Sequence, residues 1–201
     1  MTTANVLVLT PVKQAATEAS GYVDRLLALD YPAANLSVGI LESDSTDDTL
    51  GAFTNEFARL DAAGWRSTRV WQRNFGYHIP DGLPRWDPTI QLQRRRILAL
   101  SRNHLLFNAL TDDVDWVLWL DADVVEFQPD IVRLLTSLGR DIVQPHCVTE
   151  WGGPTFDQNG WRDQGRLHLD DMRGEGFLVP LHAVGGTMLL VRADRHRDGL
   201  I

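Results

Sequence analysis

Short apolar runs alternate along this chain with amphipathic stretches, and this alternation restricts the fold more than any other feature. We predict strands where apolar residues run together, at 5–9, 36–41, 69–71, 116–120, 141–144 and 186–191. Helices are predicted between them, where apolar residues recur at helical spacing, at 17–29, 50–60, 91–110 and 129–138. Strands and helices in this order are typical of a mostly parallel sheet with helices on both faces. The sequence therefore predicts a Rossmann-like α/β fold.

Two local signals predict where elements begin and end. Pro11 is expected to end the first strand, because a proline nitrogen cannot donate a hydrogen bond to a neighbouring strand. Ser45 and Asp48 have the spacing of a capping box, which predicts that the second helix begins just after them.

The chain is expected to form a single domain over 1–201, because 201 residues suffice for one good-sized core. Within that domain, residues 73–90 carry repeated glycines and prolines between aromatic residues, which predicts a long loop. Loops of this length in a compact domain are usually functional or mobile. Residues 146–182 show no clear periodicity, and we expect them to be irregular.

Composition excludes several classes of protein. The chain carries 27 acidic residues against 19 basic ones, a net charge of −8, which disfavours nucleic acid and anionic membrane surfaces as partners. A small phosphorylated ligand is compatible with this charge. Cys147 is the only cysteine, which excludes an intramolecular disulfide. The sequence shows no signal peptide and no run of about 18 apolar residues, so we expect a cytoplasmic protein or one peripheral to a membrane.

Two aspartates follow the predicted strand at 116–120. In sheets of this class ligands bind at the carboxyl ends of the strands. Asp121 and Asp123 are two residues apart, so they point to the same side if the strand continues, and they can share one Mn²⁺ or Mg²⁺ ion. Such an ion accepts phosphate oxygens and can act as a Lewis acid on a nucleoside diphosphate leaving group. Asp113 and Asp115 have the same spacing but precede the strand, where a solvated turn is the simpler interpretation.

A second acidic group follows the predicted strand at 36–41. Capping does not require acids at Glu42 and Asp44, which stand where the base or ribose of a nucleoside could be hydrogen-bonded. The run from Asp44 to Thr49 resembles the end of the second strand in nucleotide-diphospho-sugar glycosyltransferases of the GT-A fold. That resemblance implies that Asp44 contacts the nucleotide.

Several segments, taken in order, resemble the mannan-polymerase family (Anp type) of α-mannosyltransferases, which is known from the fungal Golgi and has bacterial relatives. The segments that carry the resemblance are 29–32, 42–49, 102–106, 116–125, 141–145, 156–161, 184–187 and 196–199. The resemblance implies a GT-A fold, a GDP-mannose donor, Mn²⁺, and retaining transfer of mannose to a glycan or glycolipid acceptor. We expect a bacterial member of the family, with residues 146–182 on the acceptor side.

The same resemblance implies a set of donor-binding residues. Thr10 and Pro11 would shape the nucleotide pocket, together with Glu42 and Asp44 at the end of the next strand. Arg102 would lie near the phosphates of the donor.

The catalytic and metal-binding residues are expected at Asp121 and Asp123. Asp121 would face the ribose or the metal, and Asp123 would be the metal ligand. Gly185 and Gly186 would allow the backbone to approach the sugar, because they lack side chains. The alternative for these glycines is a bulge or tight turn before the last strand.

The sequence departs from the family pattern in three places. His182 and Ala183 stand where the family tends to have Asp-Gly. The family's membrane anchor is not found, and the chain ends at Ile201, where we expect a Phe-Pro segment and then a metal-binding histidine. A shortened carboxyl terminus is therefore expected. His196 could replace that histidine, although a surface histidine is the simpler interpretation.

Two other functions are compatible with these motifs. One is a catalytically inactive sugar-nucleotide-binding domain or polymerase subunit. The other is a phosphohydrolase of the haloacid-dehalogenase type, which also places Asp-x-Asp after an apolar strand. Those enzymes need a later cationic residue and normally have the nucleophile near the start of the chain, whereas no lysine follows Lys13 here. The sequence leaves the oligomeric state open.

Overall fold

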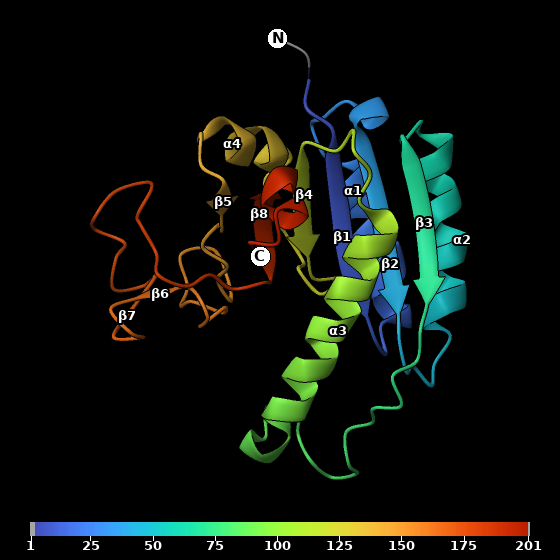
Figure 1. Ribbon diagram of the computed structural model, residues 1–201, viewed down its shortest axis with the longest axis horizontal. Helices are drawn as coiled ribbons and strands as arrows, with labels where there is room; N and C mark the ends of the chain where they lie inside the picture. Colours follow the sequence, from blue (N-terminus) through green and yellow to red (C-terminus); the bar gives the residue numbers. More distant parts are fainter. Residues whose placement is uncertain (1–2, 201) are drawn as a thin grey trace.

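A computed structural model describes residues 3–200 and shows a central sheet between two layers of helices (Figure 1). Within these residues the main sheet has six strands in the order β3-β2-β1-β4-β8-β5. The parallel part consists of β1 (Val6–Val12), β2 (Leu36–Glu42), β3 (Ser67–Gln72) and β4 (Trp116–Leu120). β8 (Met188–Arg192) runs antiparallel to β4, and β5 (Ile142–Val143) runs antiparallel to β8. The predicted mostly parallel sheet is confirmed.

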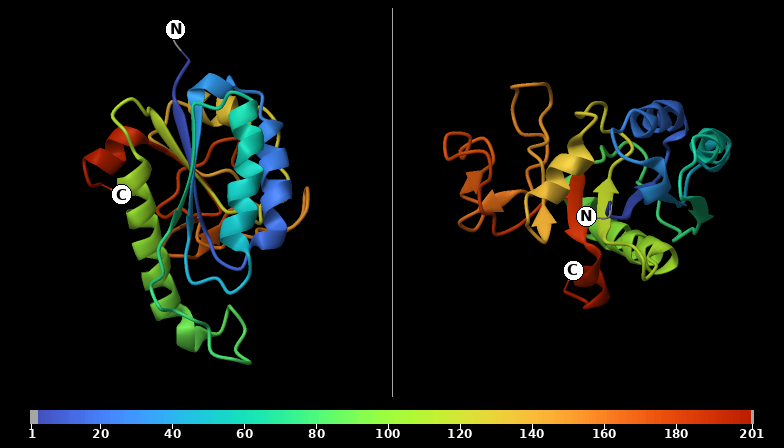
Figure 2. Two further views of the ribbon diagram at one scale, coloured as in Figure 1. Left: turned by 90° about the vertical axis from the view of Figure 1, so that its right-hand side faces the viewer. Right: turned by 90° about the horizontal axis from the view of Figure 1, so that it is seen from above.

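Helices cover both faces of this sheet, as Figure 2 shows. One face packs against α1 (Ala19–Leu27), α2 (Thr49–Ala62) and α4 (Ile131–Ser137). The other face packs mainly against α3 (Gln91–Ala109), and α5 (Ala193–Arg197) follows β8 on that side. Three short 3-10 helices join these elements: η1 (Ala16–Glu18), η2 (Ala33–Asn35) and η3 (Pro88–Ile90).

Each layer of helices buries its own part of the core. On the side of α1 and α2, Tyr22 and Phe53 meet edge to face with ring centroids 5.7 Å apart, and Phe57 packs on Phe53 in the same way. On the side of α3, Leu105 and Trp119 belong to a second buried cluster. The alternation of side chains along β4 produces this division, because successive residues of a strand face opposite sides.

Two local predictions are wrong. β1 continues past Pro11 to Val12, with Pro11 opposite Leu41 in β2. β4 pairs only with the first four residues of β1, so at Pro11 the strand has a neighbour on one side only and the missing donor is tolerated. The capping box is also not formed: Asp48 caps α2 without a side-chain hydrogen bond, and the Ser45 hydroxyl accepts from the backbone of Gln14.

Two long segments extend from the sheet. Residues 73–87 contain no helix or strand and lead into η3 and α3. Residues 146–182, predicted to be irregular, include a small separate sheet of β6 (Trp161–Arg162) and β7 (Leu167–His168). Figure 1 shows this second segment beyond β5, at the opposite end of the sheet from α2.

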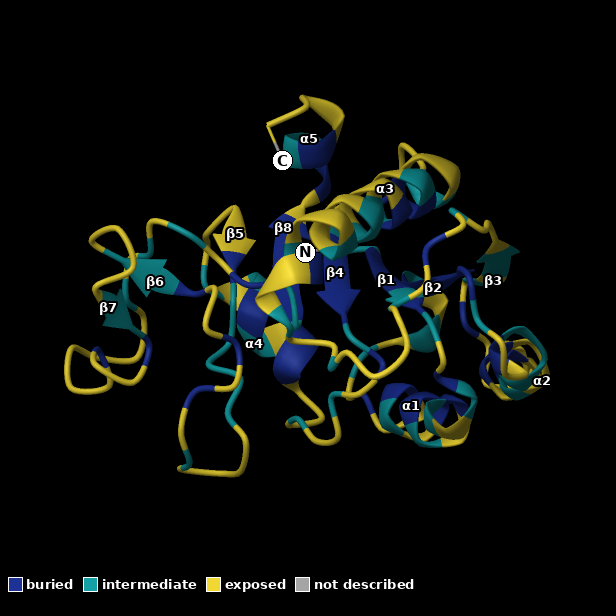
Figure 3. Ribbon diagram, turned by 90° about the horizontal axis from the view of Figure 1, so that it is seen from below, coloured by how far each residue is buried: buried dark blue, intermediate teal, exposed yellow. Residues whose placement is uncertain are grey.

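The distribution of exposed residues agrees with one layered core. Figure 3 shows buried residues along β1, β4 and β8, and exposed residues along the outer side of α3. Within residues 3–200, no helix is both long and apolar enough to span a membrane.

Phe53→Ala is expected to destabilise the protein by about 3–5 kcal/mol, because Phe53 is 0% exposed and its removal leaves a cavity between Tyr22 and Phe57. Phe107→Ala is the matched control, since Phe107 is 80% exposed on α3 and should change stability by no more than about 0.5 kcal/mol. Urea unfolding of both variants measures the difference. Equal losses in the two variants would contradict the described core.

Candidate functional site

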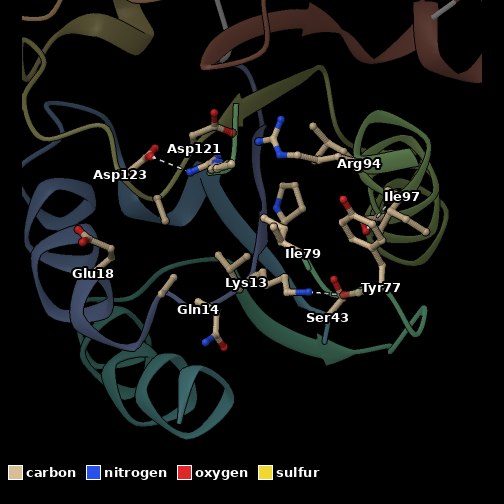
Figure 4. A pocket seen from close by; sticks show the side chains of 17 residues that line it. Lys13, Gln14, Glu18, Ser43, Tyr77, Ile79, Arg94, Ile97, Asp121 and Asp123 are labelled. Atoms are coloured by element: carbon tan, nitrogen blue, oxygen red, sulfur yellow. Dashed lines mark hydrogen bonds and ion pairs between the residues drawn. The ribbon is translucent and has the colours of Figure 1, made fainter. Parts of the chain in front are cut away.

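A cavity of about 490 Å³ opens where β1, β2 and β4 end (Figure 4). Its floor comes from the residues that follow these strands, and its walls come from α3 and from the segment after β3. The residues that line it and are used below are Pro11, Lys13, Ser43, Tyr77, Ile79, Arg85, Arg94, Ile97, Ser101, Asp121 and Asp123. The cavity therefore lies at the carboxyl ends of the parallel strands, where the topology predicts a ligand-binding site.

Asp121 and Asp123 lie at one end of this cavity. Among the described residues, neither carboxylate accepts a hydrogen bond, and their ion pairs are long: 3.8 Å from Arg102 to Asp121 and 3.9 Å from Arg85 to Asp123. Burial raises the pKa of Asp121 to about 6, with Arg102 opposing the shift and Asp123 adding to it. These two carboxylates thus keep free lone pairs and repel each other.

The donor set at Asp121 and Asp123 fits a hard divalent cation. Two carboxylates without other hydrogen bonds supply the oxygen ligands that Mn²⁺ and Mg²⁺ prefer, and a cation would relieve their mutual repulsion. In residues 3–200 no three His, Cys, Asp or Glu side chains are grouped as a metal site. Among the described residues that line the cavity, Asp121 and Asp123 are the adjacent carboxylates that could hold such a cation.

Three cationic side chains line the same cavity. Arg94 enters from α3, and Figure 4 shows its guanidinium on the side of Asp121. Burial, and then the like charge of Arg85, lower the pKa of Arg94 below its ordinary value. Lys13 follows β1, and its ammonium donates to the backbone carbonyl of Tyr77. Arg94 was not among the predicted site residues, although it lies on the same helix as Arg102, eight residues before it.

Two residues predicted to bind the donor are buried and held by hydrogen bonds within the fold. Thr10 is 0% exposed, lies outside the cavity lining, and its hydroxyl bonds Tyr22 and the carbonyl of Leu120 at 2.7 Å each. Glu42 is also buried, and its carboxylate accepts from the Ser45 backbone at 2.9 Å and from the Gln72 side chain at 2.8 Å. The polar atoms of both side chains thus make their hydrogen bonds within the protein. Pro11, by contrast, does line the cavity.

Asp44 anchors the segment after β3 rather than facing the cavity. Its carboxylate accepts hydrogen bonds from the backbone N–H groups of Phe75, Gly76 and Tyr77, the shortest at 2.8 Å. Asp44 adopts a φ of 56°, which turns its side chain toward that segment. Burial alone would raise the pKa of Asp44, but these backbone donors hold it below its ordinary value. The prediction that Asp44 contacts the nucleotide is therefore not supported by its position.

Gly185 and Gly186 are needed for side-chain packing at the start of β8. A Cβ on Gly185 would overlap the carboxylate of Asp157, and a Cβ on Gly186 would overlap the guanidinium of Arg102. Arg102 donates to the carbonyl of Gly186 at 3.0 Å and lies over the ring of Trp119. Its guanidinium is also 3.8 Å from the carboxylate of Asp121. Arg102 therefore contacts Asp121 without lining the cavity. This packing is a further reason for glycine at both positions, and approach of the backbone to a sugar stays a prediction.

Asp157 is a buried residue of the segment 156–161, which carries part of the family resemblance, but it was not predicted as a site residue. It is 4% exposed and accepts from the backbone N–H of Thr187 at 3.1 Å and from Asn159. Thr187 in turn accepts from the backbone of Asp121 at 2.9 Å. Asp157 therefore connects the segment 146–182 to the strand end that carries Asp121. Its place in a long irregular segment gave no periodic signal.

His196 is not on the surface. It is 7% exposed on α5, where its ring meets Trp119 edge to face and its Nε2 accepts from the indole N–H at 3.4 Å. A surface histidine, the simpler interpretation, is therefore wrong, because the helix after β8 packs this residue against the core.

Gly185→Ala and Gly186→Ala are each expected to destabilise the protein, by about 1–3 kcal/mol, because the new methyl groups displace Asp157 or Arg102. Gly174→Ala is the control, since nothing lies within 4 Å of its added Cβ. Thermal unfolding by circular dichroism compares the three variants. If Gly185→Ala unfolds at the wild-type temperature, the packing described for Asp157 is incorrect.

The Asp44 anchor predicts a defined pH dependence of stability. Because its folded-state pKa is depressed, Asp44 stabilises the fold above its unfolded-state pKa of about 3.9, and this contribution is lost as pH falls. Asp44→Asn should lose about 1–3 kcal/mol of unfolding free energy at pH 7, and the difference from wild type should shrink between pH 5 and pH 3. Urea unfolding across this range measures it, and a constant difference would contradict the anchor.

Comparison with known proteins shows the family of this chain. The sequence model of the Anp1 family matches residues 1–179. The mannan polymerase complex subunit mnn9 of Schizosaccharomyces pombe is 28% identical over an alignment covering 98% of this chain and 68% of that protein. The mannan polymerase II complex ANP1 subunit of Saccharomyces cerevisiae is 26% identical, covering 87% of this chain and 37% of that protein. These relatives are fungal, so the expectation of a bacterial source gains no support from them.

Solved structures agree on the fold. The mannosyltransferase PcManGT from Pyrobaculum calidifontis, in complex with GDP-Man and Mn²⁺, superposes with a TM-score of 0.51 at 19% identity, over 75% of this chain and 37% of that one. TarS of S. aureus superposes with a TM-score of 0.54 at 15% identity, over 98% of this chain and 49% of that one. Both are GT-A glycosyltransferases, which confirms the predicted GT-A fold. With its fold and most of its sequence matched, this chain belongs to the Anp1 family.

Proposed function

We propose that this chain is a metal-dependent glycosyltransferase domain that transfers mannose from GDP-mannose, with retention, to a glycan or glycolipid acceptor. The observation that carries the proposal is that one cavity holds three cationic side chains and two adjacent carboxylates, whose ion pairs are 3.8 and 3.9 Å long and which accept no hydrogen bond from the described residues. The carboxylates are suitable ligands for a divalent metal ion. The cationic side chains can bind the diphosphate that the metal ion would accompany. Membership of the Anp1 family supports mannosyl transfer among the chemistries this arrangement allows.

The residues of the cavity have separate tasks in this reaction. Asp121 and Asp123 would hold Mn²⁺, or Mg²⁺, which when bound lowers the charge of the donor diphosphate and acts as a Lewis acid on it. Arg94 and Arg85 stabilise the negative charge that grows on the departing diphosphate. Arg102 and Asp157 hold the ends of β4 and β8 together, which keeps Asp121 in place.

The transfer exchanges one bond for another at the anomeric carbon. The bond from this carbon to the diphosphate oxygen breaks and GDP leaves with the electron pair. A bond to the acceptor hydroxyl oxygen forms on the same face, and the hydroxyl proton passes to the departing diphosphate oxygen. The segment 146–182, joined to the site through Asp157, is proposed to form the acceptor side.

A non-catalytic role is the second candidate, and the names of the relatives favour considering it. They are described as subunits of mannan polymerase complexes, and they extend beyond the part matched here. A domain that binds the sugar nucleotide within such a complex would need the same cavity but no turnover. The phosphohydrolase interpretation gains no support from the family or from the fold neighbours. The cellular location, cytoplasmic or peripheral to a membrane, stays a prediction.

Asp123→Asn is expected to lower the affinity for GDP in the presence of Mn²⁺ by at least about tenfold, because one of the two metal ligands loses its charge. Affinity without metal should change little. Asp112→Asn is the control, since Asp112 is exposed and lies outside the cavity. Calorimetric titration with GDP, with and without Mn²⁺, measures these affinities. Mn²⁺-independent binding by the wild type would contradict the metal site.

Release of GDP from GDP-mannose distinguishes the two candidate functions. Transfer to mannose-terminated acceptors, with one GDP released for each sugar transferred, is the result expected for the enzyme. Binding of GDP-mannose without turnover in the presence of Mn²⁺ and these acceptors would favour the non-catalytic subunit.

A further inference from the structure

The cavity has two chemically different ends. Asp121, Asp123 and Arg94 lie at one end in Figure 4, while Lys13 and Ser43 lie at the other. The first end carries the groups that suit a metal and a diphosphate. At the second end, Figure 4 shows the apolar side chain of Ile79 close to Lys13. Apolar walls with a few fixed polar groups that set orientation are typical of small-molecule binding sites.

The backbone after β2 decides which side chain faces this second end. Asp44 has a φ of 56°, and its carboxylate accepts hydrogen bonds from the backbone N–H groups of residues 75–77 rather than lining the cavity. Ser43, the residue before it, lines the cavity instead and is 7% exposed. Its backbone N–H donates to the carbonyl of Val12 at 3.2 Å, which fixes Ser43 beside the end of β1. In the described part of the chain its hydroxyl has no hydrogen-bond partner.

Lys13 supplies the second polar group at this end. Its ammonium has three N–H donors, and the hydrogen bonds of the described residues use one of them, to the carbonyl of Tyr77. The ammonium also lies 5.5 Å from the centroid of the Tyr77 ring, which restricts its position. Asp44 is the acid whose charge is coupled to Lys13, but its carboxylate is already bonded to backbone N–H groups. Lys13 therefore keeps two donors for a ligand.

We propose that Lys13 and Ser43 donate hydrogen bonds to acceptor atoms of the donor's base, so that this end of the cavity selects a 6-oxopurine over a 6-aminopurine. The inference rests on the proposed function, which places the diphosphate at the Asp121 end. Guanine presents two acceptors, O6 and N7, on one edge, whereas adenine presents an amino donor in place of O6. An ammonium and a hydroxyl that both donate match the guanine edge and oppose the adenine amino group.

The test is calorimetric titration of the full chain, with Mn²⁺ present, using GDP, inosine diphosphate, ADP and inorganic pyrophosphate. The wild type should bind GDP and inosine diphosphate with similar affinity, because both carry O6 and N7, and ADP at least about tenfold more weakly. Lys13→Met should weaken GDP about tenfold or more and remove most of the preference over ADP. Ser43→Ala should weaken GDP about threefold to tenfold. Neither substitution should change the affinity for pyrophosphate.

Ser137→Ala is the control, because Ser137 lies on α4 outside the cavity lining and its hydroxyl donates to the carbonyl of Leu134 at 2.7 Å. Its affinity for GDP should equal that of the wild type. Equal binding of GDP and ADP by the wild type, or a loss of pyrophosphate affinity in Lys13→Met as large as the loss for GDP, would overturn the inference and leave the proposed function standing. Much weaker binding of inosine diphosphate than of GDP would also overturn it, since the 2-amino group would then be read by an acceptor. If the wild type binds none of the nucleotides, the proposed function fails as well. Unfolding temperatures of all variants show that they are folded.

Discussion

Two negative charges at the end of one strand are the constraint around which the rest of the site is arranged. Asp121 and Asp123 repel each other, and burial raises the pKa of Asp121 to about 6. Arg102 and Arg85 approach them but stay 3.8 and 3.9 Å away, too far for hydrogen bonds. The charges are therefore only partly compensated by the protein. Partly compensated carboxylates beside cationic side chains favour binding of a cation together with an anion. A divalent metal ion with a diphosphate is such a pair.

One helix serves both the support and the lining of this site. Arg102 on α3 reaches under Asp121 to the carbonyl of Gly186, and Arg94, two turns earlier, enters the cavity itself. The close fit at Gly185 and Gly186 ties the same strand end to Asp157. A shift of α3 or of the segment 146–182 would thus move the metal-binding carboxylates. This coupling explains why residues remote from the cavity can matter for the chemistry.

The sequence was sufficient for the architecture and for the position of Asp121 and Asp123 at the end of a strand. The apolar run at 116–120 became β4 with the same bounds, because a strand buried on both faces needs uninterrupted apolar residues. The place of Asp121 and Asp123 then followed from topology alone. Periodicity could not show side-chain direction in loops: a left-handed backbone at Asp44 turned that carboxylate away from the cavity and left Ser43 facing it. Nor could it show the packing that requires Gly185 and Gly186, because Asp157 and Arg102 are distant in sequence.

The central claim is that Asp121 and Asp123 hold a divalent cation that accompanies a nucleoside diphosphate. Diffraction from crystals grown with GDP and Mn²⁺, collected at a wavelength where manganese scatters anomalously, tests it most directly. The account predicts one strong anomalous peak at about 2.0–2.3 Å from carboxylate oxygens of both aspartates, with phosphate oxygens completing the coordination. A bound GDP without a peak at these two residues, or a peak held by other side chains, would contradict it.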